Sequence, residues 1–415
     1  MSFGTYWFIF WQNNQQRVTM TSENSTMKVV ADENIPFVKE AFSEFGDVIT
    51  ISGRKITREI LQDASILLVR SITPVNQNLL EGTNIKFIAT ATIGTDHIDT
   101  HYLMENSIGF AFAPASNADS VAEYVIAAIL TMVQKKKLNL SNITLGIIGV
   151  GNVGSRVFRH ASSLGVKCLL NDPPKRRLTQ SDFYVSLDQV LEDSDIITIH
   201  VPLTTSGEDV TYRMVSHEFL ERMKPGTILI NTSRGKVIDE KSLRAAHAKT
   251  GGLVLDVWEN EPGINLETLR MTDICTPHIA GYSYDGKLRG TQMIYNAACA
   301  FFFRNPSWSI PNEIATEIIN EIDITNSLQP INDAVFSAYP IMEDDRRLRE
   351  ILNKDKSEQE KYFDELRKKY PRRNEFSHFA VKSSNTQTDT LRILSALGFA
   401  SGLGLKTPEN PLTKE

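Results

Sequence analysis

A glycine-rich turn at residues 149–154 constrains what this 415-residue chain can fold into more than any other feature. The sequence there is GVGNVG, and it stands between an apolar strand-like run and an amphipathic, helix-like stretch. Gly149 permits a tight turn, Gly151 lets a pyrophosphate approach the backbone, and Gly154 allows the helix to pack closely on the strand. This context predicts a dinucleotide-binding unit with the pyrophosphate at the helix N-terminus. The residues expected to contact the cofactor at this turn are Gly149, Gly151, Asn152, Val153 and Gly154.

An acidic residue at the end of the next predicted strand supports this interpretation. Asp172 follows the last glycine of the turn by about 20 residues, where the acid that binds the adenosine ribose is expected. Its charge repels a 2′-phosphate, so we expect NAD as the cofactor. NADP stays open as an alternative, because Lys175, Arg176 and Arg177 offer positive charge to such a phosphate. An ordinary strand–helix turn without a ligand is the other alternative.

Short apolar runs alternate with amphipathic stretches on both sides of the turn. Alternation of this kind predicts parallel sheets that are covered by helices on both faces. We expect one α/β unit from residue 27 to residue 117, and a second from residue 118 to residue 281. The strands expected in the two units are 28–32, 47–52, 65–71, 86–92 and 109–115, then 143–149, 166–172, 195–201, 226–232 and 252–258.

The two ends of the chain differ from this pattern. Residues 341–373 hold 20 charged side chains among 33, which we interpret as solvated helices with ion pairs between residues i and i+4. With the strand-like and helix-like runs that follow, they predict a small α+β domain over 306–415. Residues 1–26 are expected to lie outside the fold, as a disordered or non-native extension. A signal anchor is the alternative for its apolar first eleven residues, which lack a basic flank.

Composition excludes several classes of partner. The chain carries 44 basic and 50 acidic residues, a net charge of −6, so nucleic acid is not an expected ligand. No stretch beyond the first residues is apolar enough to predict a membrane span. The three cysteines show no metal-type spacing, so we expect neither a metal site nor a disulfide framework, and a cytoplasmic location.

Three residues after predicted strands form a set suited to oxidising a 2-hydroxy acid. His278 suits a proton acceptor because imidazole titrates near neutrality, and a carboxylate such as Glu261 would orient it. Arg234 would clamp a substrate carboxylate. Glu259 is a less favoured choice for the histidine partner. Each of the three also has an ordinary explanation: a surface arginine, a helix N-terminal acid and a structural histidine.

Four segments then resemble the D-2-hydroxyacid dehydrogenase family in order: GIIGVGNVG, INTSRGKVID, LDVWENEP and TPHIAG. The resemblance implies an NAD-dependent dehydrogenase with a flavodoxin-like substrate-binding domain, residues 27–117 and 282–305, and a Rossmann NAD-binding domain, residues 118–281. Both are doubly wound parallel-sheet domains. It assigns the substrate carboxylate to Arg234 and the acid/base role to His278, paired with Glu261. Further cofactor contacts that it implies are Thr232, Asp256, Gly281 and Tyr282.

Within that family the segments 30–36, 68–76, 90–99 and 278–291, with the tail, resemble members that act on a phosphorylated sugar acid. The resemblance implies substrate contacts from Ser71 and Thr92, and a homodimer formed through residues 306–415. A phosphate needs cations, for which we expect Arg70 together with Arg346 or Arg347; surface ion pairs are the alternative for the last two. Two other functions stay open: a dehydrogenase of 3-phosphoglycerate, and an NAD-sensing corepressor that binds peptides.

Overall fold

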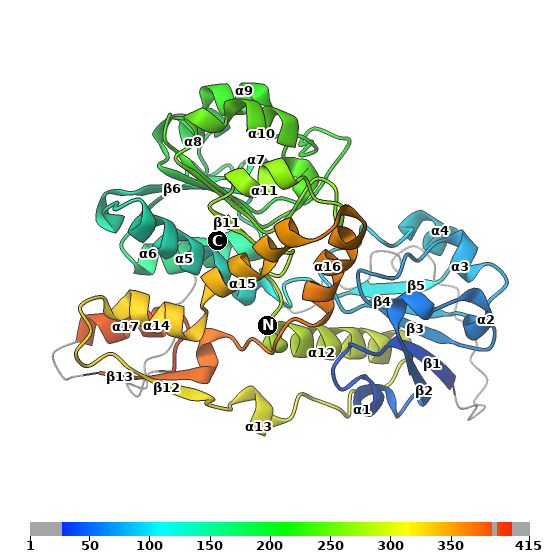
Figure 1. Ribbon diagram of the computed structural model, residues 1–415. Coiled ribbons are helices and arrows are strands. Elements are labelled where there is room, and N and C mark those ends of the chain that lie inside the picture. The colour runs from blue at the N-terminus through cyan, green and yellow to red at the C-terminus, as the bar shows by residue number, and fades with distance from the viewer. Residues whose placement is uncertain (1–26, 384–387, 401–415) are drawn as a thin grey trace. The chain divides into compact units, whose positions relative to one another are not determined.

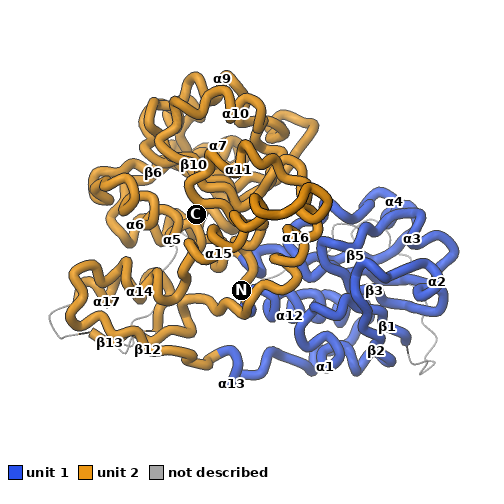
Figure 2. The backbone as a smooth tube through the Cα atoms, in the orientation of Figure 1, with its two compact units in different colours: residues 1–117, 284–315 blue, residues 118–283, 316–415 orange. Residues whose placement is uncertain are grey.

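The computed structural model describes residues 27–383 and 388–400, and these residues form two compact units (Figures 1 and 2). Unit 1 contains residues 27–117 and 284–315, and unit 2 contains residues 118–283 and those from 316 onward. The expected N-terminal extension, residues 1–26, lies outside the described residues. Each unit is described by itself below.

Unit 1 is built on a five-stranded sheet with the order β2-β1-β3-β4-β5. All its strands are parallel, and β3 and β4 are buried along their whole length. This is the flavodoxin-like order, which confirms the predicted class of the first domain. Its elements are β1 (Met27–Asp32), α1 (Val38–Phe42), β2 (Gly46–Ile51), η1 (Gly53–Lys55), α2 (Arg58–Leu61), β3 (Ile66–Val69), α3 (Gln77–Leu80), β4 (Phe87–Thr90), α4 (Thr100–Glu105) and β5 (Gly109–Phe112).

Helix α12 (Tyr284–Phe301) belongs to unit 1 although it follows the second sheet in the chain. Its Tyr295 is buried edge-on against the rings of Phe42 and Phe45, and its hydroxyl donates a hydrogen bond to Glu44. Gly109 makes room for the helix, because a β-carbon there would lie 2.3 Å from the Phe301 ring. The return of the chain to the first unit is therefore held by aromatic packing. The short α13 (Asn312–Ala315) ends the unit.

Unit 2 contains a six-stranded parallel sheet with the order β11-β10-β9-β8-β6-β7. The chain runs from β6 outward to β7 and then returns to β8 on the other side of β6, so the strand order reverses there. Ligands of open α/β sheets bind at such a switch point. The elements are α5 (Ala118–Lys135), η2 (Leu140–Asn142), β6 (Thr144–Ile148), α6 (Asn152–Ser163), β7 (Lys167–Asn171), α7 (Pro173–Thr179), α8 (Leu187–Asp193), β8 (Ile196–Ile199), α9 (His217–Arg222), β9 (Ile228–Asn231), η3 (Gly235–Val237), α10 (Glu240–Ala246), η4 (His247–Lys249), β10 (Gly252–Leu255), α11 (Leu266–Met271) and β11 (Ile274–Cys275).

The C-terminal region packs into unit 2 beside the second sheet, and the separate domain expected over 306–415 stays a prediction. Phe376, Phe379 and Leu394 are buried in one apolar core with Val125 of α5, which explains why this region and the second sheet form one unit. Residues 306–315 go with unit 1. The elements are β12 (Asn320–Asp323), α14 (Pro330–Ala338), α15 (Ile341–Arg349), η5 (Glu350–Asn353), α16 (Lys356–Lys368), η6 (Phe376–His378), β13 (Phe379–Lys382), parallel to β12, and α17 (Thr388–Ala396).

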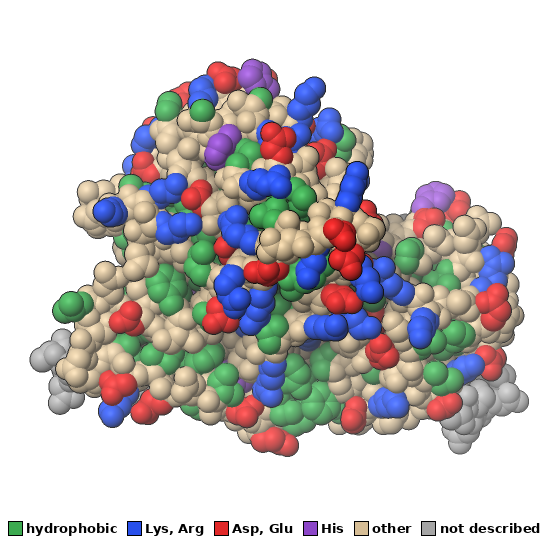
Figure 3. Space-filling view, viewed as in Figure 1, with side chains coloured by type: hydrophobic (Ala, Val, Ile, Leu, Met, Phe, Trp, Pro, Cys, Tyr) green, Lys and Arg blue, Asp and Glu red, His purple; other side chains and the backbone are tan. Residues whose placement is uncertain are grey.

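The charged run of this region forms the ion pairs that its spacing predicts. Arg347 pairs with Glu343, and Lys369 pairs with Glu365, each across one helical turn. Figure 3 shows basic and acidic side chains interspersed over α15 and α16. The interpretation as solvated helix faces is confirmed for these pairs.

No helix among residues 27–383 and 388–400 is long and apolar enough to cross a membrane. Within the same ranges, no three Cys, His, Asp or Glu side chains gather in a way that would hold a metal ion. All three cysteines are free thiols.

Candidate active site

The glycine turn joins β6 to α6 with a geometry that fits a dinucleotide. Gly149 has a φ of 84°, in the left-handed region that favours glycine. A β-carbon on Gly154 would lie 2.0 Å from the Gly149 carbonyl oxygen, so only glycine lets α6 approach the turn this closely. Around Gly151, by contrast, the space that a β-carbon would enter is open. Asn152 and Val153 begin α6, whose first backbone N–H groups are therefore accessible to an anionic ligand.

Asp172 lies beside this turn, at the end of β7. Its Oδ2 accepts a hydrogen bond from the Val150 N–H at 2.9 Å, and its Oδ1 accepts one from the Lys175 N–H at 3.0 Å. Lys175 and Arg177, two of the residues that could bind the 2′-phosphate of NADP, interact with other groups of the protein. The Lys175 ammonium donates to the Val150 carbonyl at 2.6 Å, and Arg177 pairs with Asp209. Their engagement leaves less positive charge for a 2′-phosphate and favours NAD.

His278 and Glu261 form a hydrogen-bonded pair. His278 Nδ1 lies 2.8 Å from Glu261 Oε2, while Glu261 Oε1 accepts a hydrogen bond from the Trp258 N–H at 2.9 Å. Burial alone would raise the pKa of Glu261, but the His278 ring, together with the charge of Arg367 and the Trp258 N–H, outweighs burial, so this pKa lies below its ordinary value. Because a carboxylate only accepts, Nδ1 carries a proton and Nε2 is left to exchange one. Glu259, the other candidate partner, pairs with Arg213 at 2.8 Å.

The loop that carries His278 is held by Asp256. His278 has a φ of 58°, which is uncommon for a residue with a side chain. Asp256 stabilises this backbone, because its carboxylate accepts hydrogen bonds from the N–H groups of Ile279 and Ala280 at 2.7 and 3.0 Å. It also accepts one from the Thr276 hydroxyl at 2.7 Å. Asp256 is 1% exposed, and its hydrogen bonds fix the shape of this loop. Its contact with the cofactor stays a prediction.

Arg234 follows β9, next to the loop that carries Glu261. Gly235 makes this proximity possible, since a β-carbon on it would lie 1.8 Å from the Trp258 carbonyl oxygen. The Asn231 side chain braces the turn by donating to the Arg234 carbonyl at 3.0 Å and accepting from the Ser233 N–H, also at 3.0 Å. Arg234, Glu261 and His278 thus follow β9, β10 and β11, which are neighbours in the sheet and end at the same edge.

Thr232 and Tyr282, two other predicted cofactor contacts, are tied to residues that the sequence reasoning missed. Thr232 Oγ1 lies 3.3 Å from Nδ1 of His200, a half-buried residue after β8. Burial lowers the pKa of His200 to about 3, so the ring is neutral. Tyr282 follows Gly281 on the loop that carries His278, and its hydroxyl accepts a hydrogen bond from Arg367 at 3.0 Å. The sequence offered little to single out these two partners: His200 is a polar residue after a strand, and Arg367 is one of many charged residues on its helix.

In unit 1, the predicted substrate residues lie at the carboxyl ends of neighbouring strands. Arg70 and Ser71 follow β3, and Thr92 follows β4. The Thr92 hydroxyl donates to the Gly94 carbonyl at 3.1 Å and lies 2.7 Å from the Thr90 hydroxyl. Ser71 is exposed and Arg70 is half-buried.

Lys287 adds a second cation to this edge, and the sequence reasoning missed it. It lies half-buried on α12, where burial and, next, the charge of Arg70 lower the pKa of Lys287 to about 8. Gly290 follows on the same helix face, and a β-carbon there would lie 3.0 Å from the Ala91 carbonyl oxygen. This face of α12 therefore meets the carboxyl edge of the sheet. Two cations at that edge favour an anionic ligand. Lys287 lies within segment 278–291, which resembles family members that act on a phosphorylated sugar acid, and this resemblance was the sequence signal for it.

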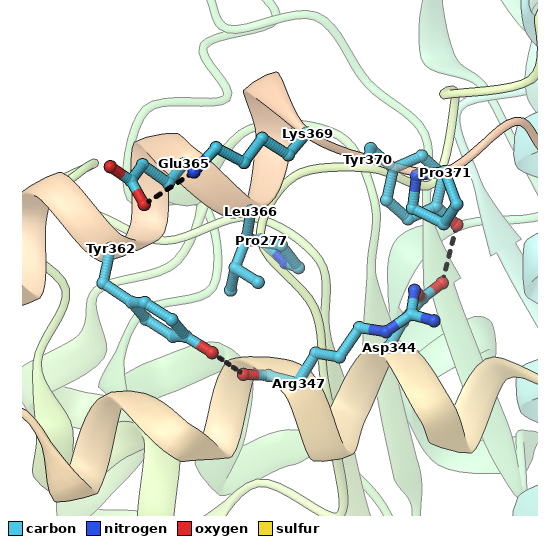
Figure 4. Close-up of a pocket in the computed structure, with 9 residues that line it drawn as sticks. All are labelled: Pro277, Asp344, Arg347, Tyr362, Glu365, Leu366, Lys369, Tyr370 and Pro371. Atoms are coloured by element: carbon cyan, nitrogen blue, oxygen red, sulfur yellow. Dashed lines mark hydrogen bonds and ion pairs between the residues drawn. The ribbon is translucent and has the colours of Figure 1, made fainter.

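Arg346 and Arg347 lie in unit 2, on α15. Arg347 lines a cavity of about 360 Å³ between α15 and the end of α16 (Figure 4). Its guanidinium lies 3.3 Å from both Glu343 and Asp344, while Arg346 is exposed. These pairs agree with the alternative of surface ion pairs for Arg347. A phosphate role for the two arginines stays a prediction.

Two family models match the chain. The NAD-binding domain of D-isomer-specific 2-hydroxyacid dehydrogenases matches residues 110–280. A second model, described as a domain of unknown function, matches residues 314–398. The first covers the glycine turn and all three residues of the Arg234, Glu261 and His278 set.

Curated relatives match nearly the whole chain. The erythronate-4-phosphate dehydrogenase of Tolumonas auensis is 41% identical over 372 residues, which are 88% of this chain and 98% of the relative. The enzyme of the same name from Klebsiella pneumoniae is 40% identical over 377 residues, 90% of this chain and 98% of the relative.

Solved structures agree with the fold. D-lactate dehydrogenase from Aquifex aeolicus, complexed with NAD and lactic acid, is 31% identical with a TM-score of 0.58, covering 66% of this chain and 95% of that chain. The NAD-bound 3-phosphoglycerate dehydrogenase of Entamoeba histolytica has a TM-score of 0.59 over 69% of this chain and 99% of that chain, but at 24% identity it shows the fold alone.

Proposed function

The chain belongs to the D-isomer-specific 2-hydroxyacid dehydrogenase family, and from this premise we propose that it oxidises C2 of 4-phospho-D-erythronate. The product is 2-oxo-3-hydroxy-4-phosphobutanoate, in the vitamin B6 pathway. The observation that carries the chemistry is the hydrogen-bonded pair of His278 and Glu261. The relatives named erythronate-4-phosphate dehydrogenase support the choice of substrate.

The residues of unit 2 suit the oxidation. His278 Nε2 takes the proton of the C2 hydroxyl, and Glu261 stabilises the imidazolium that results. Arg234 pairs with the substrate carboxylate and polarises the carbonyl group that forms. NAD, when bound, accepts the hydride from C2 and is held at the Gly149–Gly154 turn and Asp172.

The residues of unit 1 suit a phosphorylated substrate. Arg70 and Lys287 supply two positive charges, and Ser71 and Thr92 supply hydroxyl groups at the same sheet edge. The two cations should bind a phosphate dianion more strongly than they bind a neutral hydroxyl group of a substrate. The reason is that charge-assisted hydrogen bonds are about twice as strong as neutral ones. We therefore assign the distal phosphate to Arg70 and Lys287, in preference to Arg346 and Arg347.

A cytoplasmic homodimer is part of the proposal. Three free thiols, two of them buried, suit a reducing compartment. In the C-terminal region, Leu328 is 98% exposed, and Ile318 and Ile319, just before β12, are 49% and 42% exposed. Apolar side chains in such positions suit contact with a second copy of the chain. Light scattering of the wild type and of Leu328→Glu tests this; a monomeric wild type contradicts it.

A turnover screen tests the function. The purified protein is offered 4-phospho-D-erythronate, 3-phosphoglycerate and unphosphorylated D-2-hydroxy acids with NAD, and separately with a 2-oxo acid acceptor. We expect the highest kcat/KM with 4-phospho-D-erythronate, and loss of turnover in His278→Ala. A higher kcat/KM with 3-phosphoglycerate would replace the substrate assignment and keep the chemistry. Peptide binding without turnover of any acid would replace both.

A further inference from the structure

Two arginines of the C-terminal region reach the histidine loop, which we define as residues 277–283. Arg367 stands near the end of α16, and its Nη2 donates a hydrogen bond to the Tyr282 hydroxyl at 3.0 Å. Its guanidinium carbon also lies 5.7 Å from the centre of the Tyr282 ring. The second arginine, Arg373, donates from Nη1 to the Ala280 carbonyl at 3.0 Å. Two residues of the segment that follows His278, Ala280 and Tyr282, are therefore held by the tail.

Arg373 anchors the loop to the core of unit 2. It is 6% exposed, donates from Nη2 to the Ser120 carbonyl at 2.7 Å, and lies 3.5 Å from the Glu123 carboxylate. Its guanidinium also stacks 3.8 Å from the centre of the Tyr339 ring. Its contacts thus lie on α5, on the loop and in the tail, although its Nε is buried without a hydrogen-bond partner in the described part of the chain, and we assign it a structural role.

Arg367 differs from Arg373 in what surrounds it. The Nε atoms of both arginines are buried and have no hydrogen-bond partner within the described part of the chain, so this feature does not distinguish them. The positive charge of Arg367 lies close enough to Glu261 to act on that carboxylate, in addition to its bond with Tyr282. The bond to Tyr282 and the charge near Glu261 therefore link Arg367 to the catalytic pair, whereas the hydrogen bonds of Arg373 go to the backbone carbonyls of Ala280 and Ser120.

We propose that Arg367 is a positioning residue of the dehydrogenase: it holds the Tyr282 phenol, and with it the histidine loop, where His278 Nε2 meets the substrate. The inference rests on the proposed acid–base role of His278 and is independent of which 2-hydroxy acid is the substrate. It gives the region matched by the domain of unknown function a part in catalysis.

The test compares Arg367→Met with Lys368→Met, a matched control that removes an exposed cation from the next position of α16. Small displacements of a catalytic group cost up to about 100-fold in rate, so we expect kcat to fall about 10- to 100-fold in Arg367→Met. KM for NAD should change less than kcat, because the glycine turn and Asp172 are untouched and Tyr282 is the one predicted cofactor contact that Arg367 holds. Arg367→Lys should restore part of the kcat, since it keeps the charge and one donor. Turnover of Arg367→Met equal to that of the control overturns the proposal.

A double-mutant cycle with Tyr282→Phe separates positioning from loss of fold. If Arg367 acts through the phenol, the double variant should lose no more kcat than Arg367→Met alone, whereas independent effects would multiply. Should Arg367→Met fail to fold, judged by its Tm, the cycle is run with Arg367→Lys, and multiplying losses again overturn the proposal. The turnover of His278→Ala is measured in the same experiment. If His278→Ala keeps the wild-type turnover, the proposed acid–base chemistry is wrong. If His278→Ala loses turnover and the Arg367 variants keep it, only the inference about Arg367 is wrong.

Discussion

Replacing Glu261 with glutamine changes one atom of the carboxylate–histidine pair and should disable the proton acceptor. The Trp258 N–H holds Oε1 at 2.9 Å, so the new amide group must turn its nitrogen toward His278 Nδ1, 2.8 Å away. Two donors cannot share that hydrogen bond. The ring must then present Nδ1 as an acceptor and carry its proton on Nε2, where it cannot take a proton from the substrate.

The magnitude follows from that change of tautomer. General acid–base catalysis contributes about 10²- to 10⁴-fold to rate, and a wrong histidine tautomer lies near the upper end of that range. We therefore expect kcat to fall by about 10²- to 10⁴-fold, or about 2.7–5.4 kcal/mol of transition-state stabilisation. KM should change little, since Glu261 contacts His278 and not the substrate.

The assay follows the absorbance of NADH with 4-phospho-D-erythronate as substrate. Glu259→Gln is the matched control, because it makes the same exchange two residues away in a side chain that pairs with Arg213. A Glu261→Gln variant that keeps turnover within about threefold of the wild type refutes the reasoning. So does an equal loss in Glu259→Gln.

The pH dependence of this comparison has a definite sign. The pKa of Glu261 lies below its ordinary value, so the wild-type carboxylate stays charged at neutral pH and gains a proton only as the pH falls through that lowered value. At such low pH the wild type comes to resemble the variant. The ratio of the wild-type kcat to the variant kcat should therefore approach one as the pH falls. A ratio that does not change with pH would show that the negative charge of Glu261 does not sustain the rate.

Three further predictions concern the cofactor turn and the phosphate. Gly154→Ala should abolish NAD binding or unfold unit 2, since its β-carbon would lie 2.0 Å from the Gly149 carbonyl oxygen; calorimetric titration with NAD and a Tm measurement check this. Asp172→Ala should raise kcat/KM with NADP relative to NAD, and an unmoved ratio means that another group discriminates. Because the pKa of Lys287 is about 8, KM for 4-phospho-D-erythronate should rise as the pH passes that value, and Lys287→Arg should move the rise upward. A KM that does not change with pH would show that Lys287 does not bind the phosphate.

The cofactor turn and the catalytic pair were predictable because the physics behind them is local. Gly149 and Gly154 stand at fixed offsets within one strand–turn–helix unit, and both meet the close contacts that the motif implies. Glu261 and His278 each follow a strand of a parallel sheet, whose carboxyl ends share one edge. A strand assignment alone therefore predicts that they lie on the same side, and the structure places their side chains 2.8 Å apart.

Other residues depended on packing between distant segments. Arg347 stood out in the sequence as part of a basic cluster, yet in the structure it pairs with two acids of its own helix. Lys287 looked like any helix lysine until α12 packed on the first sheet and brought it near Arg70. Arg367 was one charge among many, and only the fold of the tail places it on Tyr282.

The sequence by itself predicted the two parallel-sheet units, the dinucleotide turn and the candidate set of Arg234, Glu261 and His278. These follow from periodicity, from glycine sterics and from the shared edge of parallel strands, all of which act over a few residues or one strand. Only the tertiary structure decided that the C-terminal region shares the core of the second sheet and that its arginines hold the histidine loop. Those contacts join residues 85 to 253 positions apart, and a pattern of polar and apolar residues does not specify which distant face a helix will meet.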